Sequence, residues 1–213
     1  MRVSRCPLCR NSGDRIPDTE FFLCRECRGF FRDFRRRPGR EEERARYEAH
    51  QNDVDDPGYQ RFVSPIVTAV LRDYGTDHSG LDFGAGPGPV ISKLLSDRGF
   101  RIVPYDPFFH DRPELLEDTY DYIVCCEVIE HLYSPGEEFL RLKRLLKPGG
   151  RLYCMTNLYK QGMDFKSWTY IRDPTHVFIY QAETMDWIKK KYGFSSCDIE
   201  DRLITLGNFV PSH

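Results

Sequence analysis

The sequence predicts an α/β fold in which a doubly wound, mostly parallel sheet follows a small cysteine-bearing module. Strand and helix patterns alternate from residue 80 onward, which is typical of a parallel sheet. A glycine-rich turn follows the first of these strands, and four of the eight cysteines form two CxxC pairs within the first 27 residues. With 213 residues, 40% of them hydrophobic, the chain is long enough for one such domain and a small appendage.

Changes in composition divide the chain into three parts: a cysteine module (residues 1–31), a charged linker or helix (32–60) and the main domain (61–213). Within the cysteine module, residues 21–24 are expected to form a short strand. The linker permits a helix and ends at the helix-breaking pair Pro57-Gly58. Residues 61–74 have the periodicity of an amphipathic helix and open the main domain.

The main domain then reads as a Rossmann-like succession of strands and helices. Gly99 and the run Pro148-Gly149-Gly150 are the expected ends of two helices. The expected strands are residues 80–84, 101–106, 121–126, 151–157, 195–200 and 202–210, and the expected helices are 89–99, 136–147 and 182–193.

Charge is unevenly distributed, although the formal net charge is only -2. The first 49 residues carry 13 Arg against 9 acidic residues, whereas the remainder carries 18 basic and 24 acidic residues. The first residues, MRVSRCPLCR, lack the apolar stretch of a signal peptide, and no apolar run reaches the ~18–20 residues of a membrane span. We therefore expect a cytoplasmic protein without membrane insertion.

Two CxxC pairs, separated by 14 residues, point to a metal knot in a reducing compartment. Each pair lets two thiolates converge on one ion, and four thiolates close a tetrahedral shell that leaves no place for a catalytic water. We expect Cys6, Cys9, Cys24 and Cys27 to bind a structural zinc ion, with iron or redox chemistry as the alternative. A module this small depends on its metal for much of its folding free energy.

The segment after the second pair, FFRDFRRRPGR, interleaves aromatic and basic residues. One interpretation is a nucleic-acid strip in which rings stack on bases and guanidinium groups neutralise phosphates. We favour the other, because the whole chain is slightly acidic: the rings dock the module onto its neighbour and the basic groups face water. The residues concerned are Phe30, Phe31, Phe34, Arg32, Arg35, Arg36 and Arg37.

The turn LDFGAGPGP places Gly84, Gly86 and Gly88 directly after an expected strand. Glycine permits positive φ angles there and lets the backbone approach a ligand. Asp82 precedes the turn, and Asp106 ends the next strand, where a carboxylate can hold ribose hydroxyls. A purely structural tight turn is the alternative.

Four motifs, in this order, resemble those of class I S-adenosylmethionine-dependent methyltransferases, in the broad group that includes the polyprenyl-catechol O-methyltransferases. They are LDFGAGPG, YDP, YDYIVCCEVIEHL and LLKPGGRLYCMTN, and they span most of the main domain. The resemblance implies that the glycine turn wraps the methionine part of S-adenosylmethionine, that the acid of YDP holds the ribose, and that the third strand's end approaches the sulfonium. The implied cofactor-binding residues are Asp82, Gly84, Ala85, Gly86, Gly88, Asp106, Pro107, Phe108 and Cys126.

The sequence departs from this family after the second strand. The family usually places a helix and a further strand there, and the end of that strand contacts adenine. Only PFFHDRPELLEDT stands in this position, which is too short for both elements. Phe108 or Phe109 therefore becomes the candidate for stacking on adenine.

Glu127, Glu130 and His131 follow the third strand with a spacing that would place them on one face of a helix beginning near Glu127. Carboxylates with an imidazole suit Mg²⁺, Mn²⁺ or Zn²⁺. The pattern resembles the metal site of small-RNA 3′-terminal 2′-O-methyltransferases, and part of it recurs in polyprenyl-catechol O-methyltransferases. Carried over, that resemblance implies Glu127, Glu130, His131 and the distant His176 as ligands of a divalent cation.

Two other interpretations of this cluster stay open. In the first there is no cation: Glu127 caps backbone amides, and His131 orients the substrate or acts as a base. In the second the residues are structural. The connection over residues 157–181 is too long for a simple link, so we expect either a lid with Trp168, Tyr170 and Tyr180 as walls, or ordinary packing over the sheet edge.

Three hypotheses about function follow. The first is an S-adenosylmethionine-dependent methyltransferase that acts on oxygen, or less readily nitrogen or carbon, of a small-molecule acceptor, with or without a divalent cation. The second is an RNA-modifying enzyme that docks RNA through the zinc ribbon and the basic strip. The third is a non-catalytic protein in which the ribbon binds a partner, although the ribbon can equally dock onto the chain's own main domain.

Overall fold

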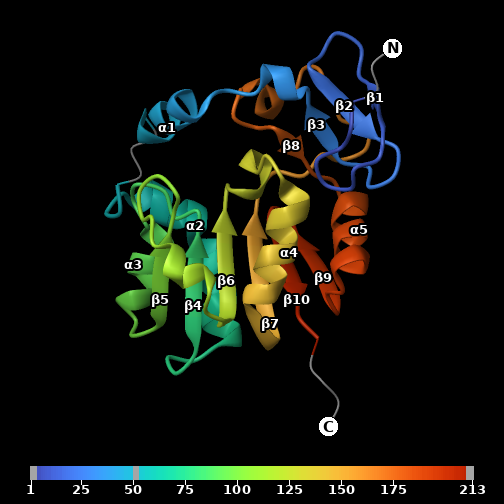
Figure 1. Ribbon diagram of the computed structural model, residues 1–213. Helices are drawn as coiled ribbons and strands as arrows, with labels where there is room; N and C mark the ends of the chain where they lie inside the picture. The colour runs from blue at the N-terminus through green and yellow to red at the C-terminus, as the bar shows by residue number, and fades with distance from the viewer. Residues whose placement is uncertain (1–3, 50–52, 210–213) are drawn as a thin grey trace.

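The computed structural model describes residues 4–49 and 53–209 and contains two sheets (Figure 1). The larger sheet has the strand order β5-β4-β6-β7-β10-β9. Strands β4 to β7 run parallel to one another, and β10 and β9 are antiparallel additions, so the predicted mostly parallel α/β fold is confirmed. The strands are β4 (Ser79–Phe83), β5 (Arg101–Tyr105), β6 (Tyr120–Cys126), β7 (Leu146–Met155), β9 (Ser196–Glu200) and β10 (Leu203–Gly207).

Helices cover both faces of this sheet. They are α2 (Pro57–Asp73) and α3 (Val90–Ser96) against one face, and α4 (Pro135–Leu145) and α5 (Ala182–Tyr192) against the other. Helix α2 begins four residues before the predicted residue 61. The Asp56 side chain accepts a hydrogen bond from the Gly58 amide at 2.8 Å, and proline occupies the first turn, where its missing N–H costs nothing.

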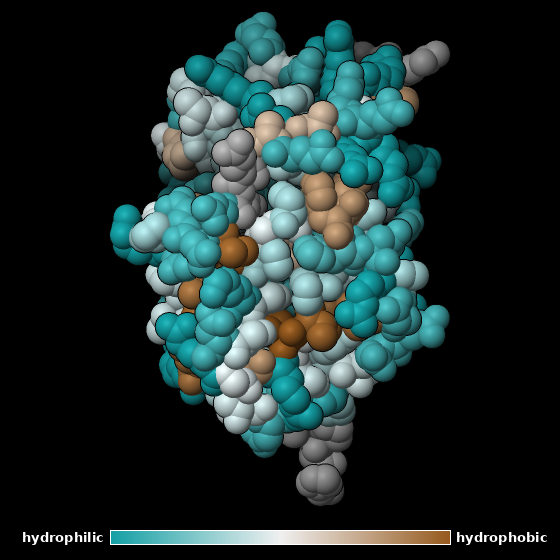
Figure 2. Space-filling model, turned by 90° about the vertical axis from the view of Figure 1, so that its left-hand side faces the viewer, coloured by the Kyte–Doolittle hydropathy of each residue, from teal (hydrophilic) through white to brown (hydrophobic). Residues whose placement is uncertain are grey.

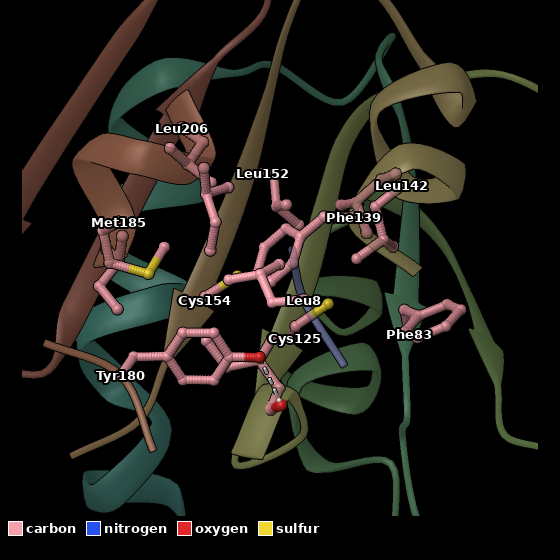
Figure 3. Close-up of a cluster of buried hydrophobic side chains, with 14 of the residues drawn as sticks. Leu8, Phe83, Cys125, Phe139, Leu142, Leu152, Cys154, Tyr180, Met185 and Leu206 are labelled. Atoms are coloured by element: carbon pink, nitrogen blue, oxygen red, sulfur yellow. Dashed lines mark hydrogen bonds between the residues drawn. The ribbon is translucent and has the colours of Figure 1, made fainter. Parts of the chain in front are cut away.

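Side chains along β6 alternate between two apolar layers, as the twofold period of a strand requires. Ile123 and Cys125 pack into the layer under α4 and α5, whereas Tyr122 and Val124 face α2 and α3. Figure 3 shows the first of these layers, with Phe139 from α4 and Met185 from α5 beside Cys125. Leu8 of the cysteine module reaches the same layer, so the module and the main domain share one core.

Strand β5 forms one edge of the larger sheet, with β4 as its only neighbour. Between β5 and β6 the chain forms a single 3-10 turn, Pro113–Leu116, and no further strand or α-helix. The shortening expected from the sequence is therefore confirmed.

The smaller sheet combines strands of the cysteine module with one strand from the second half of the sequence. Its strand order is β1-β2-β3-β8, and all its pairings are antiparallel. The strands are β1 (Gly13–Arg15), β2 (Phe21–Cys24), β3 (Phe30–Arg32) and β8 (Phe178–Ile179). The first three belong to the cysteine module, but β8 comes from the long connection after β7. In Figure 1 the module sits above the carboxyl end of the larger sheet, next to this connection.

The basic and aromatic strip takes part in this junction. Phe30 and Phe31 are buried in the smaller sheet, as the docking interpretation expects, whereas Phe34 is 70% exposed. The expectation that the basic side chains face water is wrong for Arg32, which is buried beneath the loop before β8. With two of its three rings buried, the strip offers little surface for stacking bases.

The face shown in Figure 2 is mostly hydrophilic, and its hydrophobic residues form small, separate patches. Among the residues that the structure describes, no helix combines the length and the apolar character needed to cross a bilayer.

Asp73, the last residue of α2, ties this helix to β7. Its carboxylate accepts hydrogen bonds from Arg72 at 2.8 Å, Arg151 at 2.6 Å and the Tyr153 hydroxyl at 2.7 Å. The pKa of Asp73 is lowered from 3.8 to about 2. The hydrogen bond from Arg72 contributes most, and the hydrogen bond from Tyr153 and the charge of Arg151 add to it. A lowered pKa in the folded state means that the carboxylate stabilises the fold above about pH 4, and that this stabilisation is lost as the pH falls from about 4 to about 2.

We therefore predict that Asp73→Asn lowers the free energy of unfolding by about 1–2 kcal/mol near neutral pH. Urea unfolding near pH 7 and near pH 3.5 should show the difference from the wild type shrinking at the lower pH. Asp97→Asn, which removes an exposed pair with Lys93, should change stability by less than about 0.5 kcal/mol at either pH. A difference for Asp73→Asn that stays constant with pH would contradict this assignment.

Candidate active site

The glycine-rich turn leaves β4 in a conformation that requires glycine. Gly84 and Gly86 have φ angles of 78° and 65°. A Cβ atom on Gly84 would lie 2.5 Å from Cγ2 of Val128, so both the backbone angle and the space exclude a side chain. The amides of Gly84 and Ala85 donate to the carbonyl of Tyr105 at 2.8 Å and 3.1 Å, which fixes the turn to the end of β5.

Two carboxylates hold this turn in place. Asp106 is 7% exposed and accepts hydrogen bonds from the amides of Gly86 at 3.0 Å, Phe108 at 2.8 Å and Phe109 at 3.2 Å. Asp82 is buried and accepts from the Ser92 amide at 3.2 Å and hydroxyl at 2.8 Å, which connects β4 to α3. Burial raises the pKa of Asp82 to about 6, against the opposing effect of the two Ser92 hydrogen bonds.

A cavity of about 540 Å³ opens above the carboxyl ends of β4, β5 and β6. The structure brings all nine predicted cofactor residues to its wall, together with Glu127, His131 and His176. Phe108 lines the cavity, whereas Phe109 is not among its lining residues. The nine are Asp82, Gly84, Ala85, Gly86, Gly88, Asp106, Pro107, Phe108 and Cys126. Their role in cofactor binding stays a prediction.

The acidic and histidine cluster does not lie on a helix that begins near Glu127, and that expectation is wrong. Glu127 has a φ angle of 52°, and its amide still donates to the Met155 carbonyl of β7 at 2.8 Å. Only the 3-10 turn Ile129–His131 follows. Glu127 is itself the left-handed residue at the end of β6. It therefore does not share a helical face with Glu130 and His131, with which the sequence pattern grouped it.

Three of the four proposed ligands nevertheless meet. Ligand atoms of Glu130, His131 and His176 lie within 4.8 Å of one another. Glu127 is not part of this group, and its carboxylate lies 3.7 Å from the guanidinium of Arg202. Two imidazoles and one carboxylate form a donor set that suits Zn²⁺, Mn²⁺ or Fe²⁺ better than the oxygen-loving Mg²⁺.

Backbone carbonyls orient both imidazole rings. Nδ1 of His131 lies 3.0 Å from the carbonyl of Thr175, and Nδ1 of His176 lies 2.7 Å from the carbonyl of Tyr170. A carbonyl only accepts, so Nδ1 carries the proton in each ring and the lone pair is on Nε2. This arrangement, in which a second partner fixes the tautomer, is usual for histidines that bind metals.

The carboxylates of the cluster are buried together. Glu130 is fully buried; its Oε1 accepts from the Tyr170 hydroxyl, and its Oε2 has no hydrogen-bond partner among the described residues. Burial and then the charge of Glu130 raise the pKa of Glu127 to about 8, and burial also raises the pKa of Glu130. Burial and the nearby His131 lower the pKa of His176 to about 4, so its ring is neutral at physiological pH.

Helix α1 (Arg40–Ala49) covers the cavity, a role that sequence reasoning missed. In the sequence this segment belongs to the expected charged linker, because most of its residues are polar. None of its residues is buried in the structure. Its Tyr47 ring lies 5.9 Å from the ring of Phe108 and 5.4 Å from that of His131, and Arg40 lies 5.0 Å from the Phe108 ring. A single aromatic residue in a charged helix was the available signal.

The long connection contributes to the site through its backbone and Tyr170, rather than through a row of aromatic walls. Tyr180 is fully buried and donates to the carbonyl of Ile129 at 2.9 Å (Figure 3). Trp168 stacks on Tyr170 at 5.0 Å and does not line the main cavity. A second, open hollow of about 370 Å³ adjoins the first, and the two share Asp173 and His176.

The four cysteines of the module converge. Their sulfur atoms lie within 4.8 Å of one another, with Cys6 to Cys27 at 3.6 Å and Cys9 to Cys24 at 3.3 Å. Four thiolates about 2.3 Å from one ion would lie about 3.8 Å apart, so the cluster fits tetrahedral zinc. The residues that follow the two CxxC pairs, Arg10 and Arg28, have φ angles of 65° and 60°.

The two knuckles have matching backbone contacts. The amide of Cys6 donates to Asn11 and the amide of Cys24 donates to Gly29, at 2.8 Å and 2.9 Å. The same contact five residues ahead thus shapes both loops around the sulfur cluster. Zinc binding itself stays a prediction.

Comparison with known proteins assigns the main domain. The sequence profile of the family described as "Methyltransferase domain" matches residues 49–197. The chain belongs to this methyltransferase family. The matched range contains the glycine-rich turn and Asp106, which line the cavity, and the metal-type cluster of Glu130, His131 and His176.

Individual relatives of this methyltransferase are distant. A ubiquinone biosynthesis O-methyltransferase of Sodalis glossinidius is 29% identical over 91 residues, which cover 43% of this chain and 36% of that protein. The chain therefore matches little more than a third of that relative's length.

Two solved structures share the fold. An O-methyltransferase family protein from Burkholderia thailandensis superimposes with a TM-score of 0.55 at 14% identity, covering 80% of this chain and 64% of that one. Haemonchus contortus phosphoethanolamine N-methyltransferase 2, in complex with S-adenosyl-L-methionine, gives a TM-score of 0.51 at 21% identity, with coverages of 64% and 38%.

The cysteine cluster leads to a direct prediction. Cys24→Ser should release about one zinc ion per chain, because the fourth thiolate closes the tetrahedral shell. Metal analysis of the purified protein is the measurement. Cys197→Ser, which alters a half-buried thiol outside the cluster, should keep the metal. An unchanged zinc content in Cys24→Ser would exclude the zinc assignment.

Proposed function

We propose that the protein transfers the methyl group of S-adenosylmethionine to an oxygen atom of a small-molecule acceptor, with a divalent cation bound by Glu130, His131 and His176. The observation that carries the proposal is the single cavity whose wall includes both the glycine-rich turn and two members of the ligand cluster, His131 and His176. Family membership supports methyl transfer, and the ubiquinone biosynthesis O-methyltransferases among the relatives favour oxygen as the acceptor atom.

The chain's own groups suit this cofactor. S-adenosylmethionine, once bound, supplies an electrophilic methyl group on a sulfonium. Gly84 and Gly86 leave the backbone open to the amino-acid part, Asp106 provides a buried carboxylate for ribose hydroxyls, and Phe108 is the aromatic ring available to adenine. Cys126 lines the cavity as a neutral thiol, because burial raises its pKa well above the ordinary value.

The ligand cluster suits a cation for a physical reason. A fully buried carboxylate with one unpartnered oxygen is costly unless it is protonated or meets a positive charge. Glu130 has that unpartnered oxygen, and the imidazoles of His131 and His176 lie beside it. A bound cation would lower the pKa of an acceptor hydroxyl, so that the resulting oxyanion can attack the methyl group.

The acceptor has a separate route to this cluster. The open hollow beside the main cavity is lined by Arg46, Thr169, Tyr170 and Arg172, and His176 lines both spaces. A donor in the main cavity and an acceptor in the open hollow would thus approach each other at His176. The hollow is too small for a folded macromolecule, which favours a small acceptor or the end of a chain.

A binding experiment tests the cofactor part. Gly84→Ala should weaken S-adenosylmethionine binding by about tenfold or more, because the new Cβ strains the turn and contacts Val128. Isothermal titration calorimetry is the measurement. Gly193→Ala is the matched control, since Gly193 has a φ angle of 71° but lies at the end of α5 with nothing near its Cβ position. Equal binding by the wild type and Gly84→Ala would count against this cofactor site.

Metal binding tests the second part. Glu130→Gln and His176→Ala should each weaken Mn²⁺ binding at the site by about tenfold or more, with the ribbon zinc retained. Equilibrium dialysis with metal analysis distinguishes the two ions. Glu183→Gln, an exposed acid in the first turn of α5, is the control. Methyl transfer that survives removal of every metal except the zinc would favour the metal-free alternative, in which Glu127 caps backbone amides and His131 orients the acceptor or acts as a base.

A further inference from the structure

Arg32, at the end of β3, extends from the cysteine module into the loop that carries His176. Its side chain is buried, with 5% exposed. Nε donates to the carbonyl of His176 at 3.2 Å, and Nη2 donates to the carbonyls of Ile171 at 2.9 Å and Asp173 at 2.8 Å. Three carbonyl groups of one short loop therefore share a single side chain from a distant part of the sequence.

The charge of Arg32 is matched locally. The Glu20 carboxylate accepts from Nη1, and the guanidinium lies 4.7 Å from the centre of the Phe21 ring. Both partners belong to the cysteine module. The module therefore carries a buried guanidinium whose charge is matched by Glu20 and whose Nε and Nη2 groups donate to the loop.

The main chain continues this connection toward the ligand cluster. The amide of Arg32 donates to the carbonyl of Val177 at 2.9 Å, and the amide of Val177 donates to the carbonyl of Glu130 at 2.9 Å. One continuous set of hydrogen bonds thus links β3 to both Glu130 and His176. The ring of His176 follows its backbone closely, because Nδ1 is held by Tyr170, six residues earlier in the same loop.

Other contacts between the module and the main domain lie elsewhere. The Trp187 indole donates to Glu26 at 3.3 Å, and the Gln181 amide donates to the carbonyl of Arg28; both hold the module onto α5. These contacts, with Leu8 in the shared core, also hold the module against the main domain. Arg32 is distinct, because each loop carbonyl it binds belongs to the segment that carries His176.

We propose that Arg32 is a positioning residue for His176, and that the cysteine module is thereby a working part of the methyl-transfer site. The proposal rests on the cation site of the proposed function. Without the guanidinium, three carbonyls lose their donor and the loop relaxes. His176 then no longer meets Glu130 and His131 at a separation that one ion can span.

The test compares Arg32→Lys and Arg32→Met with Arg36→Met. Arg36 stands four residues further along and faces the same Glu20 at 3.8 Å, but its side chain is 68% exposed. Lysine keeps the charge, but its donors all lie on one nitrogen. It therefore lacks the planar fork through which Arg32 reaches the carbonyls of three residues. The readouts are Mn²⁺ affinity, S-adenosylmethionine affinity and the imidazole ¹⁵N resonances of His176, assigned with His176→Ala.

If Arg32 positions His176, its variants should change Mn²⁺ affinity and the His176 resonances but leave S-adenosylmethionine affinity nearly unchanged. Mn²⁺ affinity should fall about tenfold in Arg32→Lys and further in Arg32→Met, and the His176 resonances should shift, while S-adenosylmethionine affinity stays within about twofold. Arg36→Met should match the wild type in all three. Parallel losses of both affinities would mean general destabilisation and would overturn the proposal, as would unchanged His176 resonances in both Arg32 variants.

The design separates this inference from the proposed function. If the wild type takes up no Mn²⁺ at the cluster, the cation proposal fails. The role of Arg32 is then decided by the His176 resonances alone: a shift in the Arg32 variants but not in Arg36→Met supports it, and no shift refutes it.

Discussion

Parallel pairing of β4, β5 and β6 governs where the polar groups of the site lie. Parallel strands end at the same edge of a sheet, so the residues that follow each strand become neighbours although they are far apart in the sequence. The glycine-rich turn after β4, Asp106 after β5 and Glu127 after β6 all depend on this constraint. The amides of Gly84 and Ala85 also donate to the carbonyl of Tyr105, the last residue of β5, and so fix the turn to the neighbouring strand.

The two halves of the site solve different electrostatic problems. The half around the glycine-rich turn is built from backbone, glycine and one carboxylate that accepts hydrogen bonds from three backbone amides. The other half gathers Glu127, Glu130 and Tyr170 in a buried region, where burial and then the charge of Glu130 raise the pKa values of Glu127 and Tyr170. Buried carboxylates favour a bound proton or a positive charge, and we propose that a cation held by Glu130 and the two neighbouring imidazoles supplies that charge.

Much of this could be predicted from the sequence, because local patterns specify local geometry. The strand and helix succession, the glycine turn, the missing elements after β5 and the four converging cysteines were all visible as short motifs. The i, i+3, i+4 spacing misled, because a left-handed residue at Glu127 interrupts the turn that the spacing assumes. The role of α1 and the burial of Arg32 were not predictable, since both depend on contacts with loops that no local pattern relates to them.

Strand β8 carries a consequence for how the chain acquires its fold. It completes the sheet of the N-terminal module, yet the Arg32 and His176 that meet there are 144 residues apart. Closing so long a loop is slow, and the module leaves the ribosome well before its fourth strand exists. Phe30 and Phe31 lie on the strand that pairs with β8, so this edge of the module stays unpaired until β8 has been made. Excising either the module or the connection that carries β8 would therefore leave an apolar strand edge on the other without its partner.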